Sequence, residues 1–302
     1  MRFPPYAAIA FALVAVSFSS IFIRWSDSPP LVIAAYRLLF ATAVLLPFAL
    51  AWHWKELRSL PRKDVLVMAG IGLLLGAHFG LWISSLKVQG VSVTSSVVLV
   101  TSHPILVGAL SHLVLKERIG RMTAAGIAVG IVGVTLIGIG DFGLSATTLG
   151  GDILALLGGV MVGLYLLAGR HFRQRVSVLV YVLVVYASAA ALLTVAAVAT
   201  GGMQPAGDVG REFMLFLLLA LVSQIGGHTV YNWCLKYVTA PVVSVSFVGE
   251  PVGAAILALL LLGEKPSDLV ILGAIAALAG IYLTARGQLK MGQSNEKRVK
   301  AR

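Results

Sequence analysis

The chain has 302 residues, of which 59% are apolar and 12% are charged, and its formal net charge is +11. Its mean hydropathy is +0.96. A soluble domain normally carries about 25% charged residues, so these values exclude an ordinary soluble globular protein. The single cysteine, Cys234, lies in an apolar run, so we expect neither an intrachain disulfide nor a metal site.

Ten apolar runs are candidate transmembrane helices, because about 20 residues are needed to cross the hydrocarbon layer. Two of them hold one internal charge each, Arg37 and Glu250. In chain order the runs are Phe3–Ile23, Leu31–Trp54, Val65–Leu86, Val88–Leu115, Met122–Gly140, Ile153–Gly169, Val176–Gly207, Phe213–Leu235, Tyr237–Gly263 and Leu269–Ala285. The first run is longer than the apolar region of a signal peptide and favours an uncleaved helix.

The basic residues are distributed unevenly between the two sides that ten helices create. The side with both termini carries 18 of them, and the other side carries four, Arg24, Lys87, Arg211 and Lys265. Cytoplasmic loops of membrane proteins are enriched in Lys and Arg, so we predict cytoplasmic termini and a multi-pass protein of the cell (inner) membrane. Residues 287–302 are predicted to form a basic, disordered cytoplasmic tail, which is favoured over an RNA-binding segment.

A motif occurs twice in the chain, 147 residues apart and with the same internal spacing. Its members are Pro104, Glu117, Gly126 and Gly133 in the first copy and Pro251, Glu264, Gly273 and Gly280 in the second. Each copy contains five predicted helices, and an odd number places the second copy in the opposite orientation. The sequence therefore predicts an all-α membrane protein with inverted repeats at residues 1–145 and 146–286.

The doubled pattern Pro-x12-Glu-x8-Gly-x6-Gly resembles the EamA family of the drug/metabolite transporter superfamily. Supporting segments are Ala35–Ala41 in the second helix, His78–Trp82 in the third, and Leu115–Arg118 and Leu262–Lys265 at the ends of the fourth and ninth. This resemblance implies a central substrate cavity lined mainly by helices 1, 3, 4, 6, 8 and 9, with helices 5 and 10 outside it. It also implies a transporter, since the family includes exporters of amino acids and related metabolites.

Ionisable residues inside the membrane indicate function, because burying each one costs at least about 2.5 kcal/mol. Glu250 and His103 occupy equivalent positions in the two repeats, directly before Pro251 and Pro104, which are predicted to kink their helices. Glu250 could bind a substrate amine or carry a coupling proton. We hypothesise that His103 and Glu250 face each other and share a proton, the alternative being that each is satisfied within its own repeat.

Other polar side chains of the predicted helices are candidates for the cavity. His78 and Trp82 are four residues apart, so they lie on one helix face and could bond to and stack on a substrate. Ser96 is seven residues before His103 and shares its face. The remaining candidates are Tyr165, His228, Tyr231 and Asn232. For all of these, packing between helices is the structural alternative.

Arg37 and several residues of the repeated motif are predicted to be structural. Arg37 is expected to extend to the membrane interface or to pair with Asp27. Glu117 and Glu264 are each expected to accept hydrogen bonds from the backbone N–H groups that open the following helix. The glycines Gly126, Gly130, Gly133, Gly273 and Gly280 are expected to allow close packing of helices 5 and 10.

The repeat in a membrane protein therefore predicts a secondary transporter. The resemblance implies that it exports an amino acid or related metabolite. The alternative is an exporter of amphipathic or cationic compounds. A membrane-embedded enzyme is less favoured, because no nucleophile–base set, metal cluster or cofactor motif is found. A channel is less favoured, because two near-symmetric helices with predicted kinks favour gating around a midplane site over an open pore. The expected partners are a small-molecule substrate and the lipid bilayer, with protons as a candidate coupling ion and no nucleic acid. Both a monomer and a homodimer are compatible with the sequence.

Overall fold

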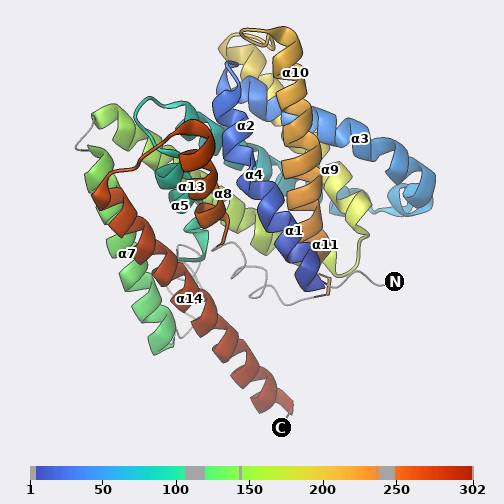
Figure 1. Cartoon of the computed structure of the whole chain (residues 1–302). Coiled ribbons are helices and arrows are strands. Elements are labelled where there is room, and N and C mark those ends of the chain that lie inside the picture. The colour runs from blue at the N-terminus through green and yellow to red at the C-terminus, as the bar shows by residue number, and fades with distance from the viewer. Residues whose placement is uncertain (1–4, 106–119, 143–144, 235, 238–248, 301–302) are drawn as a thin grey trace.

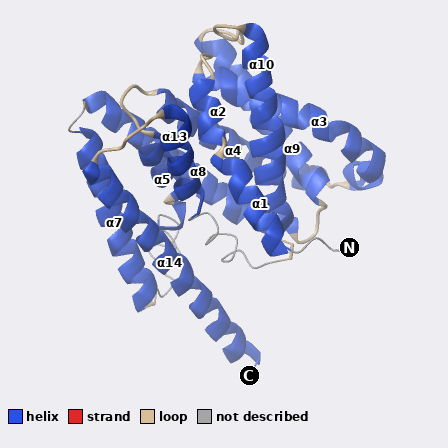
Figure 2. Ribbon diagram, viewed as in Figure 1, coloured by secondary structure: helices blue, strands red, loops and turns tan. Residues whose placement is uncertain are grey.

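The computed structural model describes residues 5–105, 120–142, 145–234, 236–237 and 249–300, without the side chains of residues 5–6, 141–142, 170–171 and 288–300. Throughout these ranges the regular elements are helices (Figure 2), as predicted. Eight helical segments are long and apolar enough to cross a membrane, and Val93–Ile105 and Gly249–Leu262 are shorter apolar helices. The chain is therefore a multi-pass helical membrane protein, and the full count of ten spans stays a prediction.

The helices follow the two predicted repeats along the chain (Figure 1). The first repeat contains α1 (Pro5–Ser17), α2 (Ser19–Trp25), α3 (Pro30–Ser59), α4 (Arg62–Lys87), α5 (Val93–Thr101) and α7 (Arg121–Phe142). The second contains α8 (Ala146–Arg173), α9 (Val178–Thr200), α10 (Val209–Leu218), the π-helix η1 (Leu219–Thr229), α11 (Val230–Cys234), α13 (Gly249–Leu262) and α14 (Asp268–Lys300). Elements α10, η1 and α11 form one continuous span, as do α1 and α2 apart from a break at Phe18.

Short polar residues fix where several helices begin. The side chains of Ser92, Ser145, Ser177 and Asp208 each accept a hydrogen bond from the backbone N–H three residues later. Such N-caps satisfy one of the N–H groups that have no partner inside the helix. The apolar run alone predicts that the fourth span begins at Val88. Because Ser92 is the N-cap, the helix begins at Val93 instead.

The two motif prolines differ in how much of their surroundings is described. Helix α5 ends at Thr101, and Ser102 leaves helical geometry with a ψ of 1°, so the backbone changes course just before Pro104. Pro251 lies in α13, and the residues before Gly249 lie outside the described ranges. The predicted kink at Pro251 therefore stays a prediction.

The predicted disordered tail is a correction to the expected architecture. Helix α14 continues to Lys300 without interruption, so most of residues 287–302 is helical. The segment is rich in Gln, Lys, Arg and Glu and contains no proline. These residues favour a helix, and the preceding membrane span supplies the nucleus from which the helix extends.

The helices α7 and α14 lie side by side (Figure 1) through the repeated glycines. Gly126 approaches the backbone of Gly280, and Gly133 approaches Gly273 and Ala277. The residue numbers of the contacting glycines rise along α7 while they fall along α14, so the two helices are antiparallel. Because Gly126 is equivalent to Gly273 and Gly133 to Gly280, the contact is symmetric about a pseudo-two-fold axis. Inverted repeats require such an arrangement, and the predicted close packing of these helices is confirmed.

The remaining contacts follow the same symmetry. Helix α4 of the first repeat packs on α8 of the second, and the equivalent span of η1 and α11 in the second repeat packs on α1 of the first. Helices α3 and α9, which are repeat equivalents, pack on each other, and so do α5 and α13. The centre of the bundle is therefore an interface between repeats. Large apolar side chains such as Phe11, Trp52, Leu66 and Leu260 are exposed on the outside, where lipid would cover them.

We predict that replacing Gly133 with alanine destabilises the protein. The added methyl group would lie 2.7 Å from both the Ala277 Cα and the Gly273 carbonyl oxygen, so α7 and α14 would have to separate. Overpacking of this kind typically costs about 1–3 kcal/mol, which should lower the melting temperature in detergent. Gly70→Ala is the matched control, since no atom lies within 4 Å of that added methyl group. Equal melting temperatures for the two variants would contradict the proposed contact.

Candidate functional site

A small cavity lies where helices of the two repeats meet. The first repeat contributes His78 and Trp82 from α4 and residues from the end of α5, and the second contributes residues from α8, η1 and α13. The full lining is His78, Trp82, Val100, Thr101, His103, Val162, His228 and Glu250. Its volume is about 20 Å3, which is room for roughly one water molecule. A metabolite would enter only after the helices separate.

His103 and Glu250, the equivalent residues of the two repeats, both line this cavity. The break at Ser102 precedes His103, and Glu250 is the second described residue of α13. Glu250 is 8% exposed, and no described residue forms a hydrogen bond or ion pair with its carboxylate. The predicted meeting of these two residues at one site thus agrees with the structure, and a proton shared between them stays a prediction.

Aromatic rings form one wall of the cavity. The rings of His78 and Trp82 are stacked with centroids 6.0 Å apart, and the His78 ring lies 6.4 Å from that of His228 on the opposite repeat. His78 Nδ1 donates to the Gly158 carbonyl at 3.0 Å, which fixes the ring against α8. The Trp82 indole N–H has no partner among the described residues, so it is a free donor beside the cavity.

The other predicted substrate residues lie outside the lining. Asn232 Nδ2 donates to the Tyr165 hydroxyl at 2.8 Å, and both side chains are buried. Tyr231 packs in a separate apolar cluster with α1. Ser96 shares a hydrogen bond of 3.0 Å with Ser85, which links α5 to α4. These contacts hold helices together, in keeping with the structural alternative that the sequence left open.

Arg37 is placed differently from either expectation. Its side chain is fully buried, so it does not extend to the interface, and it does not pair with Asp27. Nε donates to Gln224 Oε1 at 2.8 Å, and Nη1 donates to Ser19 Oγ at 2.8 Å. The guanidinium also lies 4.0 Å from the centroid of the Phe79 ring. Polar partners from α2 and η1 thus replace the water that an interfacial arginine would contact.

The π-helix η1 carries two of the residues around the centre, Gln224 and His228. The Thr229 hydroxyl donates to the Gln224 carbonyl at 3.2 Å, which closes one wide turn. Such segments are rare and frequently occur at functional sites. Sequence periodicity does not distinguish a π-helix from an α-helix, so this feature was not predicted.

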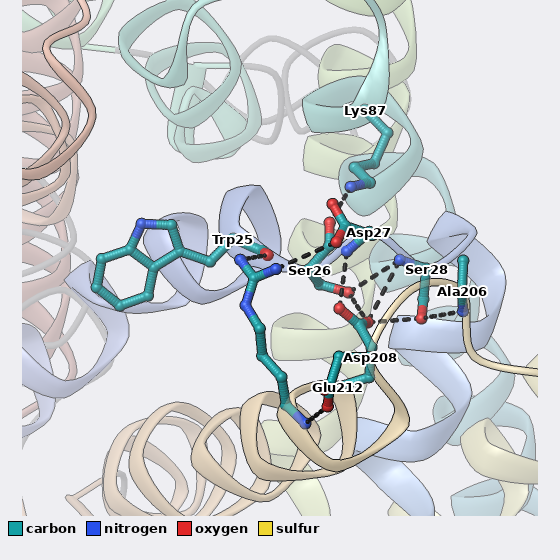
Figure 3. Close-up of polar contacts among 9 residues, drawn as sticks. Trp25, Ser26, Asp27, Ser28, Lys87, Ala206, Asp208 and Glu212 are labelled. Carbon is teal, nitrogen blue, oxygen red and sulfur yellow. Dashed lines mark hydrogen bonds and ion pairs between the residues drawn. The ribbon is translucent and has the colours of Figure 1, made fainter.

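A polar network closes the end of the bundle where the α2–α3 loop meets α10 (Figure 3). The buried Glu212 carboxylate accepts hydrogen bonds from Ser26 Oγ at 2.5 Å, Asp27 N at 2.8 Å and Ser28 Oγ at 2.6 Å. Lys87 donates to the Ser26 carbonyl from the end of α4. Hydrogen bonds to an ionised carboxylate are strong, so this network holds three spans together.

Glu264 belongs to the same end of the bundle. Its Oε1 lies 3.3 Å from Arg24 Nε, and its Oε2 accepts from Val93 N at 2.7 Å. Arg24 also donates to the Val91 carbonyl. The prediction that Glu264 accepts hydrogen bonds from the backbone N–H groups that open the following helix is therefore wrong. Glu264 accepts a hydrogen bond from the start of α5 instead. The reason is that Ser267 already caps α14, which leaves the carboxylate available to another helix.

We call Arg24, Lys87, Glu212, Glu264 and the Ser26–Ser28 loop the polar seal. At the opposite end, Glu56 accepts from Ser177 N at 2.7 Å, and the buried Arg173 donates from Nε to the Asn232 carbonyl at 2.9 Å. The half-exposed Arg175 lies 3.4 Å from Asp64. Glu117, the repeat equivalent of Glu264, lies outside the described residues.

Three of the four basic residues that the sequence predicts for one side of the membrane lie at the same end of the bundle. Lys87 donates to the Ser26 carbonyl and Arg211 to the Trp25 carbonyl, and Arg24 donates to the Val91 carbonyl and pairs with Glu264. Sequence reasoning did not single out Glu212 or Gln224. Their signal was available, since Glu212 is an acid in the first turn of a span and Gln224 is a polar residue within one.

Comparisons with known proteins agree with this architecture. The EamA-like transporter family matches the chain twice, over residues 4–139 and 149–286. An uncharacterized transporter of Archaeoglobus fulgidus is 26% identical and covers 93% of this chain and 96% of its own length. The uncharacterized transporter YdfC of Bacillus subtilis is 24% identical and covers 87% of this chain and 83% of its own. A protein crystal structure with 21% identity has a TM-score of 0.64 over 92% of this chain and 95% of that one, which shows a shared fold.

We predict that Glu212→Gln lowers stability by about 2–4 kcal/mol. The glutamine side chain carries no charge, and its NH2 group can only donate. It would therefore face the Ser26 hydroxyl and the Asp27 N–H, which now donate to the carboxylate, without forming hydrogen bonds to them. Thermal unfolding in detergent measures the effect. Asp64→Asn is the control, because its partly exposed pair with Arg175 should contribute less than about 1 kcal/mol. Similar losses in both variants would show that the Glu212 network does not hold the helices together.

Proposed function

The chain belongs to the EamA-like transporter family, and from that premise we propose that it is a secondary transporter of a small metabolite. The proposed direction is export from the cytoplasm, and the proposed substrate is an amino acid or a related compound. Transport would proceed by alternating access, in which the central site opens to one side of the membrane at a time. The proposed location is the cell (inner) membrane, with both termini in the cytoplasm.

One observation carries this proposal. His103 and Glu250 occupy equivalent positions in inverted repeats, and both line one cavity at the interface of those repeats. Transporters built from inverted repeats bind their substrate at such an interface, near the midplane of the membrane. The polar seal lies at one end of the bundle, so separation of its helices would connect the cavity to that side.

The cavity lining supports a substrate that carries both an amine and an apolar part. The Glu250 carboxylate could bind an ammonium group, and the free Trp82 N–H could donate to a second polar group. The rings of His78 and Trp82 offer a flat apolar surface for a side chain. A volume of about 20 Å3 is far below that of an amino acid, which is consistent with a closed form of a carrier.

An exporter of amphipathic or cationic compounds is the second candidate. A carboxylate beside aromatic rings also suits an organic cation, because the faces of such rings attract positive charge. A channel is less well supported, since conduction needs a continuous path and the polar seal joins several spans across one end of the bundle.

Counterflow in proteoliposomes tests the proposed function. Thermal-shift screening of the common amino acids first identifies a compound that raises the melting temperature. Proteoliposomes loaded with that unlabelled compound should then accumulate its labelled form transiently, which a channel does not do. Accumulation that is independent of the internal compound would contradict a carrier.

We predict that Glu250→Gln reduces counterflow at least about tenfold, because the neutral amide loses the charge that holds the substrate amine. The measured quantity is the initial rate of uptake at equal protein content. Asp64→Asn is the matched control, since that carboxylate lies at the end of the bundle away from the cavity and should leave the rate unchanged. Unaltered transport and pH dependence in Glu250→Gln would rule out both the amine-binding and the proton-carrying role.

A further inference from the structure

Arg37 is a permanent positive charge in the interior of a membrane protein. Its guanidinium stays protonated in proteins, and its side chain has no exposed surface. Within the described ranges, no carboxylate lies at ion-pair distance from it, and Nη2 has no hydrogen-bond partner. Its contacts with Gln224 and Ser19 are to neutral groups. A buried charge of this kind is costly without a compensating charge nearby.

Three acidic side chains are buried among the described residues, Asp152, Glu212 and Glu250. Glu212 is already satisfied by the Ser26–Ser28 loop in the polar seal. Glu250 has no hydrogen-bond or ion-pair partner among the described residues, and it lines the central cavity together with His228. It is therefore the buried acid that is placed to compensate Arg37.

The geometry connects these two residues through aromatic rings. The Arg37 guanidinium lies 4.0 Å from the centroid of Phe79, and the Phe79 ring meets that of His228 edge to face at 5.2 Å. His228 and Glu250 line the same cavity. The rings of Phe79 and His228 thus link the Arg37 guanidinium to the cavity that Glu250 lines. Both charges are buried, so their attraction is screened less than it would be at a surface.

We infer that Arg37 is the resident counter-charge of Glu250 and that it sets the cavity to select a zwitterionic substrate over a monocation. This inference rests on the proposed function, and it decides between the two substrate classes that remain there. Arg37 comes from the first repeat and Glu250 from the second, so the charge pair also spans the interface that transport must rearrange.

Charge balance gives the reason for the selection. With Arg37 and an ionised Glu250, the empty cavity region is neutral, and a zwitterion leaves it neutral. A monocation adds one uncompensated positive charge in a medium where such charges are costly. The other titratable groups that line the cavity with Glu250 are His78, His103 and His228. Protonation of any of these histidines adds positive charge, so it strengthens the discrimination against cations.

A double-mutant cycle tests the charge pair without any ligand. Arg37→Met and Glu250→Gln should each lower the melting temperature of the purified protein, because each leaves one buried charge uncompensated. The double variant removes both charges and should lose less than about half of the sum of the two single losses. Losses that simply add would overturn the inference.

Arg24 provides a matched control within the same chain. Its partner is Glu264, so Arg24→Met combined with Glu264→Gln should also be non-additive. Arg24→Met combined with Glu250→Gln should be additive, because the two residues belong to different sites. Non-additivity in that second combination would mean that the cycle reports general loosening and not a specific charge pair.

Substrate selection is tested with L-phenylalanine, a zwitterion, and L-phenylalaninamide, which is a monocation when protonated. L-Phenylalanine should raise the melting temperature of the wild-type protein more than L-phenylalaninamide does. The apparent affinity calculated from these shifts should be at least about threefold higher for the amino acid. Arg37→Met should reverse this preference, and Arg37→Lys should retain it. A preference that is the same in wild type and Arg37→Met overturns the selective role of Arg37. If neither probe shifts any melting temperature, the amino-acid substrate is wrong, while the stability cycle still decides the charge pair.

Discussion

The constraint on which this structure depends is that hydrocarbon cannot solvate a charge. Every ionised group inside the bundle must therefore be satisfied by the protein itself. Glu212 is satisfied by the hydroxyl and backbone donors of the Ser26–Ser28 loop, and Glu264 by Arg24 and the start of α5. We infer that Arg37 and Glu250 compensate each other across the repeat interface, on the two sides of the Phe79 and His228 rings. Placement of these charges joins spans that are far apart in sequence.

Duplication explains how one chain provides both a scaffold and a site. The glycines of α7 and α14 are the same in both copies and form a symmetric antiparallel contact. The residues before the two motif prolines differ, and they meet in the cavity as His103 and Glu250. The matching glycines thus form the contact between α7 and α14, whereas the residues before the two prolines differ and place two unlike titratable groups in the cavity lining.

Much of this arrangement could be predicted from the sequence. Apolar runs located the spans, the repeat gave the inversion, and ionisable residues within spans identified His78, His103, His228 and Glu250 as cavity residues. Burial of Arg37 could not be predicted, because it depends on Ser19 and Gln224, which come from two other spans. The partner of Glu264 was missed for the same reason, and η1 was missed because a wide helical turn leaves no periodic signal.

The central claim is that one cavity between the repeats opens to the two sides of the membrane in turn. Labelling of a single cysteine tests it most directly, with Val162→Cys in the cavity wall and Cys234→Ser to remove the native thiol. A membrane-impermeant maleimide should label this residue from one face before substrate is added and from the other face under the opposite gradient. Labelling from both faces under a single condition would contradict alternating access.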